Sequence, residues 1–447
     1  MRIVNLVWRV GGDAPPVVLI LQYQELHAFC SACRSGIVRV PSILIVLIAS
    51  VLALAVGCAA PDVAQQPTAI AREDVAATAA APTATGAKTP RARLEPARGT
   101  YFGVNLDWDQ DSVAEFNARL GAPAAVYVEF TRFPLSEQDV TVLDGFIEQV
   151  KAQHGLALIT LEPYIALDDI NLANTAGLVD VLQRYDSSGV PVFLRFAQEM
   201  NGSWYRWSQQ PSSYVRAFRL LADEVHRRTK QTAMLWAPNY GGGYPFRGGK
   251  YEAKPGTKDF TLLDTNGDGI LDQNDDTYAP YYPGDDAVDW VGMTTYHWGD
   301  RWPWGKNIVP EANKFTAQIT GTYNGAAGDE QPVPDFYAIY AEERGKPMAV
   351  PETSAFYNTT VSGDAEQDIK RLWWRQVFSA EVAERFPAIK MVNWFEWRKA
   401  ESEVGGAVVD WTFTSNPDTV RLFLDDLPKG RFLFAGDIVG NGPATTR

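Results

Sequence analysis

Two glutamates stand out because each follows directly on a short apolar run. Glu199 comes after residues 192–196, and Glu352 comes after residues 347–350. Runs of this length are typical of buried strands, so both carboxylates are expected where a strand opens into a loop. The alternatives are, for Glu199, a loop carboxylate that is solvated or paired with Arg195 or Arg206, and, for Glu352, a structural carboxylate paired with Arg195.

This pair of residue types has a definite chemistry. Two carboxylates on either side of a glycosidic bond are sufficient to hydrolyse it, one as the acid and the other as nucleophile or base. If the two groups lie close together, the charge of Glu352 keeps Glu199 protonated as the acid. Carboxyl groups about 5 Å apart would indicate retention of configuration, and groups about 9 Å apart would indicate inversion.

Composition narrows the chemistry further. The 447 residues carry a net charge of −14, which argues against nucleic acid as a partner because a polyanion would be repelled. All three cysteines, Cys30, Cys33 and Cys58, lie in the first 58 residues. A cysteine nucleophile or a Cys/His zinc site is therefore excluded from the rest of the chain.

The first part of the chain has the composition of an export segment followed by a tether. Residues 43–56 form an apolar run of the length of a signal-peptide core, and the run ends just before Cys58 in a sequence that resembles a lipoprotein cleavage box. We expect residues 1–58 to be a leader, with Cys58 as lipid anchor at the cell surface; an ordinary secretory signal and an uncleaved anchor are the alternatives. Residues 59–98 are rich in Ala, Thr and Pro and are expected to be a disordered linker.

From residue 99 to residue 440, short β-rich runs alternate with amphipathic stretches. Eight expected strands and seven expected helices over this length predict a (β/α)8 TIM barrel of the α/β class. A doubly wound open sheet is the alternative, although no glycine-rich phosphate loop follows the first strand. The expected strands are 101–105, 125–130, 156–161, 192–196, 232–237, 290–294, 347–350 and 389–394. The expected helices are 111–120, 137–154, 176–185, 212–228, 335–344, 365–386 and 418–427.

The carboxyl ends of these strands, where a barrel carries its chemistry, are rich in carboxylates, amides and indoles. Such groups suit a neutral polyhydroxylated ligand, because polar groups meet hydroxyls and aromatic faces cover sugar rings. A polysaccharide is the expected substrate. The candidate substrate-binding residues are Asn105, Trp108, Glu162, Gln198, Trp204, Trp207, Asn239, Tyr296, Trp298 and Trp394.

The segments RFAQEMNGSWYRW, YYPGDDAVDWVGMTTY, KPMAVPET and VNWFEW resemble glycoside hydrolase family 26. This resemblance implies a retaining enzyme with Glu199 as acid/base, Glu352 as nucleophile, Tyr296 orienting the nucleophile and Trp394 as the floor of the central sugar subsite. Gln198 stands where the family usually has histidine, and Thr353 follows the nucleophile. The family is best known for β-mannanases, so β-1,4-mannan is the leading substrate. β-1,3-Xylan and mixed-linkage β-glucan are the alternatives.

Residues 264–275 match the calcium loop of an EF-hand. Oxygen ligands fall at Asp264, Asn266, Asp268, Asp272 and Asp275, with the carbonyl of Ile270 as a further ligand and glycine at the sixth position. We expect a structural Ca²⁺ in this insertion, and no catalytic cofactor. An acidic turn without metal is the alternative.

The expected protein is a secreted, monomeric endo-β-glycosidase, and two functional alternatives stay open. A barrel that has lost its activity would be a non-catalytic surface glycan-binding lipoprotein. An active enzyme could instead process the exopolysaccharide of its own cell.

Overall fold

The computed structural model describes residues 4–8, 17–21, 91–325, 328 and 330–438. The chain divides into two units, residues 1–85 and 86–447. The first unit contains an antiparallel pair, β1 (Val4–Trp8) and β2 (Val17–Leu21). The predicted signal segment, Cys58 and the linker up to residue 90 lie outside the described residues. Within the described part, no helix has both the length and the apolar character needed to cross a membrane.

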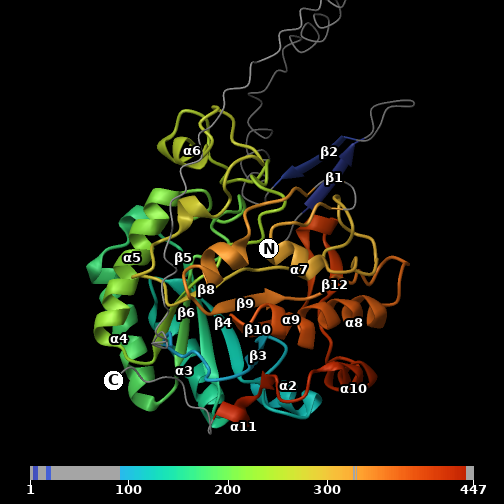
Figure 1. Ribbon diagram of the computed structural model, residues 1–447. Helices are drawn as coiled ribbons and strands as arrows, with labels where there is room; N and C mark the ends of the chain where they lie inside the picture. The colour runs from blue at the N-terminus through green and yellow to red at the C-terminus, as the bar shows by residue number, and fades with distance from the viewer. Residues whose placement is uncertain (1–3, 9–16, 22–90, 326–327, 329, 439–447) are drawn as a thin grey trace, which may run out of the picture. The chain divides into compact units, whose positions relative to one another are not determined.

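The second unit is a closed barrel of eight parallel strands, as predicted (Figure 1). Each strand pairs with the next along the chain, and β10 pairs with β3 to close the barrel. A ninth short strand, β13 (Phe432–Leu433), adds to the start of β3. The barrel strands are β3 (Thr100–Leu106), β4 (Val126–Phe133), β5 (Leu156–Pro163), β6 (Val192–Phe196), β7 (Thr232–Trp236), β8 (Trp290–Gly292), β9 (Met348–Thr353) and β10 (Ile389–Glu396).

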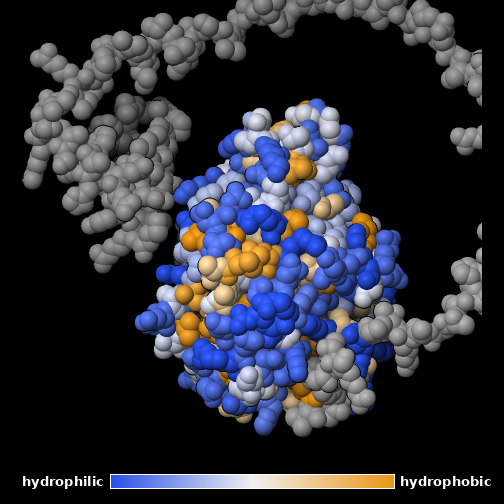
Figure 2. Space-filling model, turned by 90° about the vertical axis from the view of Figure 1, so that its left-hand side faces the viewer, coloured by the Kyte–Doolittle hydropathy of each residue, from blue (hydrophilic) through white to orange (hydrophobic). Residues whose placement is uncertain are grey.

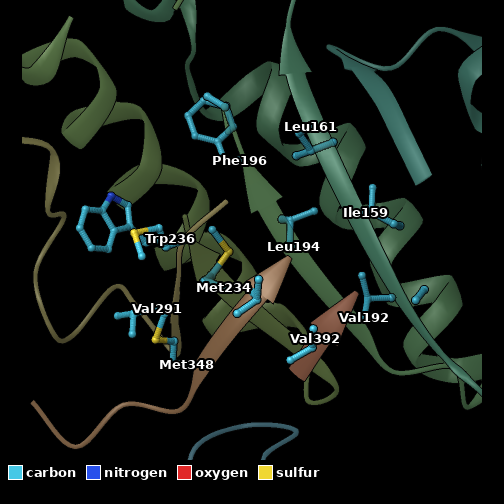
Figure 3. Close-up of a cluster of buried hydrophobic side chains, with 14 of the residues drawn as sticks. Ile159, Leu161, Val192, Leu194, Phe196, Met234, Trp236, Val291, Met348 and Val392 are labelled. Atoms are coloured by element: carbon cyan, nitrogen blue, oxygen red, sulfur yellow. The ribbon is translucent and has the colours of Figure 1, made fainter. Parts of the chain in front are cut away.

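The barrel strands are buried on both sides, so their side chains form two apolar clusters. Alternate residues of a strand point to opposite faces. One cluster fills the barrel with residues such as Leu158, Phe193 and Met391. The other lies between the barrel and its helices, and Figure 3 shows part of it, including Leu194 and Val392. Toward the carboxyl ends, the inward positions change from apolar to polar residues.

Local signals in the sequence account for the ends of the main helices. Ser136 caps α3 (Glu137–Ala152) in a capping box with Asp139, and Asn171 caps α4 (Leu172–Ser188) in the same way. Pro211 begins α5 (Pro211–Arg228), where its missing N–H costs nothing. Two further helices that cover the barrel are α2 (Val113–Leu120) and α10 (Pro417–Asp426).

Several elements differ from the prediction. The single helix expected at 365–386 is two helices, α8 (Glu366–Val377) and α9 (Ala380–Arg385). Ser379 caps the start of α9, because its side chain accepts from the N–H of Val382. The helix expected at 335–344 is a π-helical segment, η3 (Tyr337–Glu342). Short helices α6 (Lys258–Leu263), α7 (Lys314–Ile319) and α11 (Ala435–Ile438) were not expected. A hairpin, β11 (Arg398–Glu401) with β12 (Ala407–Asp410), was also not expected.

The surface on the side of α4 and α5 is mainly hydrophilic, with apolar residues in small separate groups (Figure 2). The insertion that carries α6 projects beyond the barrel (Figure 1). It lies between β7 and β8, as predicted for the segment that contains residues 264–275. Short 3-10 turns, η1 (Leu167–Asp169), η2 (Ala279–Tyr281) and η4 (Ser402–Val404), complete the described elements.

The prediction that Trp394 forms the floor of a sugar subsite is wrong. Trp394 has no exposed surface and packs on the outer side of β10 against Trp374 and Phe413. Its neighbours Asn393 and Phe395 occupy the inward positions, because successive residues of a strand alternate between its two faces. A ring between the barrel and its helices cannot contact a substrate.

Replacing Trp394 therefore tests packing rather than binding. We expect W394A to lower the free energy of unfolding by about 3–5 kcal/mol, the usual cost of removing a buried aromatic ring. The matched variant W397A removes a half-buried ring that stacks on Phe395 with a centroid distance of 5.6 Å. W397A should lower the free energy of unfolding less than W394A does, and it should raise KM more than W394A does. Denaturant unfolding and steady-state kinetics measure both, and a raised KM without loss of stability in W394A would contradict this placement.

Candidate active site

Glu199 follows β6 in a tight loop with an unusual backbone. Ala197 and Glu199 have positive φ angles of 47° and 54°. Such conformations cost a non-glycine residue on the order of 1–3 kcal/mol and gather at functional sites. The Glu199 N–H donates to the carbonyl of Ala237 at 3.2 Å, which ties the loop to the end of β7.

Residues just after Glu199 hold this loop in place. The Asn201 side chain donates to the carbonyl of Asn239 at 2.8 Å and accepts from the Asn239 N–H at 2.8 Å. A side chain at Gly202 would place its first carbon 2.5 Å from the indole of Trp204, so only glycine fits there. That indole donates from Nε1 to Oε2 of Glu199 at 3.1 Å. The glycine therefore permits a direct contact between Trp204 and the carboxylate.

Glu352 is aimed into the barrel by an irregularity in β9. Val350 pairs with Val392 and Thr353 pairs with Trp394, so β9 has one more residue than β10 between these pairs. An extra residue of this kind is a β-bulge, which redirects a side chain and is common beside active sites.

Both carboxylate oxygens of Glu352 accept a hydrogen bond inside the barrel. Arg195, which has no exposed surface, donates from Nη1 to Oε1 of Glu352 and from Nη2 to the hydroxyl of Thr294. The hydroxyl of Tyr296 donates to Oε2 of Glu352 at 3.0 Å. The pairing with Arg195 is thus present, and it holds Glu352 inside the barrel with a charged donor on one oxygen.

The two glutamates interact electrostatically. Burial raises the pKa of Glu199, and the negative charge of Glu352 raises it further, to about 7. Arg195, the Trp204 indole and Lys399 act in the opposite direction. Glu199 therefore keeps its proton at a pH where an ordinary glutamate has lost it.

Gln198 and Glu162 form a polar pair beside the glutamates. Gln198 donates from Nε2 to Oε1 of Glu162 at 3.0 Å, and its buried Oε1 has no partner among the described residues. Burial raises the pKa of Glu162. Trp207, itself buried, donates to the carbonyl of Gln198 at 2.8 Å and stacks on Tyr205. Trp207 therefore supports the loop from behind.

The unexpected hairpin β11–β12 builds an aromatic wall next to Glu352. Trp411 directly follows β12, and its ring lies 5.2 Å from Tyr296 and 4.8 Å from Trp298, measured between ring centroids. The Trp411 indole donates to Glu401 at 2.8 Å. Trp411 was missed by the sequence analysis. The signal for it was the pair Gly405–Gly406 directly before the short β-branched run at 407–410, which is typical of the turn and second strand of a hairpin.

The remaining predicted residues fall into two groups. Asn105 is buried on the inner face of β3 and accepts from the indole of Trp397 at 3.3 Å. Asn239 is half-buried and forms an isolated parallel β-bridge with Thr294. The hydroxyl of Thr294 also accepts a hydrogen bond from Arg195. Trp108 instead donates to the carbonyl of Val128 at 3.0 Å and packs on α3, and no described contact joins it to either glutamate.

Hydrogen bonds from backbone N–H groups shape the predicted calcium loop. Asp264 accepts from the N–H groups of Gly267, Asp268 and Gly269 at 2.9–3.1 Å, and the two glycines have φ of 74° and 83°. Leu271 is buried and anchors the loop. Among the described residues, no three acidic, histidine or cysteine side chains converge on a point that could hold a metal.

A sequence model of glycosyl hydrolase family 26 matches residues 167–256. This stretch includes β6, Glu199 and the loop that positions it. The predicted resemblance to family 26 is confirmed. Over the matched residues, the chain is similar to the glycoside hydrolases of this family.

Endoglucanase H of Acetivibrio thermocellus is 22% identical to this chain over 301 residues, which cover 65% of the chain and 26% of that protein. The chain thus spans about a quarter of that relative's length. A Cellulomonas fimi endo-β-1,4-mannanase double mutant has 16% identity and a TM-score of 0.47, covering 78% of this chain and 74% of its own. The Bacteroides ovatus β-mannanase BoMan26A has 15% identity and a TM-score of 0.45, covering 76% of this chain and 92% of its own.

The raised pKa of Glu199 predicts a pH-dependent effect on stability. The folded chain holds this proton more tightly than the unfolded chain, so Glu199 destabilises the fold progressively as the pH rises from about 4.5 to about 7. We expect E199Q, which cannot ionise, to raise the melting temperature relative to wild type at pH 8 and to have less effect at pH 5. Thermal unfolding at both pH values measures this, with the exposed-surface variant E148Q as control. An equal effect of E199Q at both pH values would contradict the raised pKa.

Proposed function

We propose that this chain is a retaining endo-β-glycosidase, with β-1,4-mannan as its leading substrate. The observation that carries the proposal is the unequal environment of the two glutamates. Glu352 is held by a buried arginine and a tyrosine hydroxyl, whereas Glu199 retains its proton because of burial and the charge of Glu352. A nucleophile and an acid need this difference.

The proposed reaction has two steps. Glu352 attacks the anomeric carbon while Glu199 gives its proton to the leaving oxygen, which breaks the glycosidic bond and forms a glycosyl ester on Glu352. Glu199, now ionised, then takes a proton from water. The resulting hydroxide attacks the same carbon and releases Glu352. As the bond to Glu352 forms, the charge that raises the pKa of Glu199 disappears, so proton release becomes easier.

The choice of sugar rests on the family and on one relative. β-Mannanases are the best-known members of family 26, which supports mannan. The name of the relative Endoglucanase H supports a β-glucan as the second candidate. β-1,3-Xylan is the third. Gln198 and Glu162 lie beside the catalytic pair and are the polar groups best placed to discriminate sugar hydroxyls.

A polysaccharide panel tests the proposal. We expect the release of reducing ends from one of β-mannan, glucomannan, mixed-linkage β-glucan, β-1,3-xylan and xyloglucan. E352Q and E199Q should each reduce kcat by at least about 10³-fold on that substrate, as is usual when one group of a catalytic unit is removed. The first product should keep its β configuration by NMR. Binding to a glycan without hydrolysis would instead support the glycan-binding lipoprotein.

We propose that the enzyme acts outside the cell and is attached to the membrane through lipid on Cys58. The apolar run 43–56 and the box that ends at Cys58 support this location. The Ala/Thr/Pro-rich segment after Cys58 would then act as the tether.

We also propose that residues 264–275 bind a structural Ca²⁺. The donors are all oxygens, which Ca²⁺ prefers, and the backbone N–H groups already orient Asp264 and Asp275. Asp264, Asn266, Asp268, Asp272, Asp275 and the carbonyl of Ile270 would hold the ion. Ca²⁺ would neutralise the acidic side chains and fix the insertion between β7 and β8.

Removing the ion tests this site. At a Ca²⁺ concentration about 100 times Kd, we expect Ca²⁺ to stabilise the fold by about 2.7 kcal/mol relative to a chelator. D268N should reduce this difference, because it removes a charge while keeping an oxygen next to the Ile270 N–H. D418N, on the exposed face of α10, is the control. Equal melting temperatures with Ca²⁺ and with chelator would remove the calcium assignment.

A further inference from the structure

Two arginines meet one exposed tyrosine at the carboxyl ends of β4, β5 and β6. The guanidinium carbon of Arg132 lies 4.9 Å from the ring centroid of Tyr164, and that of Arg206 lies 5.5 Å from it. Arg206 also donates to the carbonyl of Tyr164 at 2.6 Å. Half of the Tyr164 surface is exposed, and both arginines are exposed. We call Arg132, Tyr164 and Arg206 the arginine–tyrosine cluster.

The positive charges of this cluster are not matched by ion pairs. Neither Arg132 nor Arg206 has a carboxylate oxygen within 4.0 Å among the described residues, although the whole chain has a net charge of −14. Glu162 is the acidic group that faces Arg132, and its interaction lowers the pKa of Glu162 without a direct contact. Two like charges beside one ring repel each other, so an anion bound there would be stabilised by both.

The cluster belongs to the edge of the catalytic centre. Arg132 is directly opposite Glu162 in the pairing of β4 with β5, and Tyr164 follows two residues later. Glu162 accepts from Gln198, the neighbour of Glu199. Arg206 lies in the loop that also holds Trp204 against Glu199. A sugar chain that passes Glu199 and Glu162 therefore reaches the two guanidinium groups next.

A purely structural role explains only part of this arrangement. The hydrogen bond from Arg206 to the Tyr164 carbonyl ties two loops together. Arg132 makes no such bond, and its described contact is with the tyrosine ring. Planar guanidinium groups recognise carboxylates through paired N–H donors, while an aromatic ring supports a sugar face.

We propose that the arginine–tyrosine cluster is a subsite for a carboxylated sugar residue, next to the sugar that is cleaved. This inference rests on the proposed function, because it concerns the same polysaccharide chain. It changes the proposed substrate from a neutral polysaccharide to a polysaccharide that carries acidic sugar residues or acidic substituents at intervals. The neutral sugars occupy the catalytic centre, where Glu162, Glu199 and Glu352 would repel an anion.

Binding to matched oligosaccharides tests the subsite. The full chain carrying E199Q, which prevents turnover, is titrated with mannohexaose and with mannohexaose oxidised to a carboxylate at a single C6, as mixed positional isomers. Cellohexaose and its oxidised form are run in parallel. We expect one oxidised hexaose to bind about tenfold more tightly than its neutral parent at low salt, the gain of a charge-assisted contact. The gain in affinity should shrink at about 0.5 M salt, because exposed charges are strongly screened at that concentration.

Variants in the same background locate the effect. R132Q and R206Q should each remove most of the gain and leave binding of the neutral hexaose within about twofold. R301Q, an exposed arginine on the loop after β8 that pairs with Asp300, is the matched control and should keep the gain. Equal affinity for neutral and oxidised hexaoses, or a gain that survives in R132Q and R206Q, would overturn the subsite. If neither the neutral nor the oxidised hexaoses bind, the subsite fails together with mannan and β-1,4-glucan as substrates, so the neutral hexaoses separate loss of the subsite from loss of the proposed substrate.

Discussion

The buried pair of Arg195 and Glu352 is the constraint on which the rest of the site depends. A carboxylate inside a barrel is stable only if its charge is matched, and losing one partner of such a pair costs about 3–5 kcal/mol. Arg195 on β6 supplies the charge, Thr294 accepts its second donor, and Tyr296 covers the other oxygen of Glu352. Three parallel-strand ends, those of β6, β8 and β9, must therefore stay in register for the carboxylate to be tolerated.

The negative charge of Glu352 also affects the protonation state of Glu199. Glu199 lies on a strained loop after β6 and is half-buried, so a second negative charge beside Glu352 would be unfavourable. Its proton removes that conflict and is also the proton that a leaving sugar needs. The Trp204 indole donates to Glu199, and the ring of Trp411 packs against Tyr296, the donor to Glu352. In the proposed reaction, the acid role of Glu199 and its destabilising effect at high pH thus have one physical origin.

The barrel could be predicted because its signals are local. Short apolar runs alternating with amphipathic helices indicate eight strands, and strand ends indicate Glu199 and Glu352. The pairing of Glu352 with Arg195 was anticipated as an alternative, whereas the bulge in β9 could not be read in this way, because it depends on register between strands distant in sequence. The prediction placed Trp394 on the wrong face of its strand. Successive residues of a strand alternate between the two faces, so Trp394 and its neighbours Asn393 and Phe395 cannot share one face. The hairpin before Trp411 has a turn signal at Gly405–Gly406, but it lies outside the strand–helix alternation from which the barrel is predicted.

The most direct measurement of the central claim is the pKa of the Glu199 carboxyl group, followed by ¹³C NMR in wild type and in E352Q. Burial and the charge of Glu352 both raise this pKa, with burial as the larger cause. Removing the charge should therefore lower the pKa of Glu199 from about 7 while leaving it above the ordinary value of 4.5. An unchanged pKa in E352Q would contradict the coupling between the two glutamates. An ordinary pKa in the wild type would contradict the assignment of Glu199 as the acid.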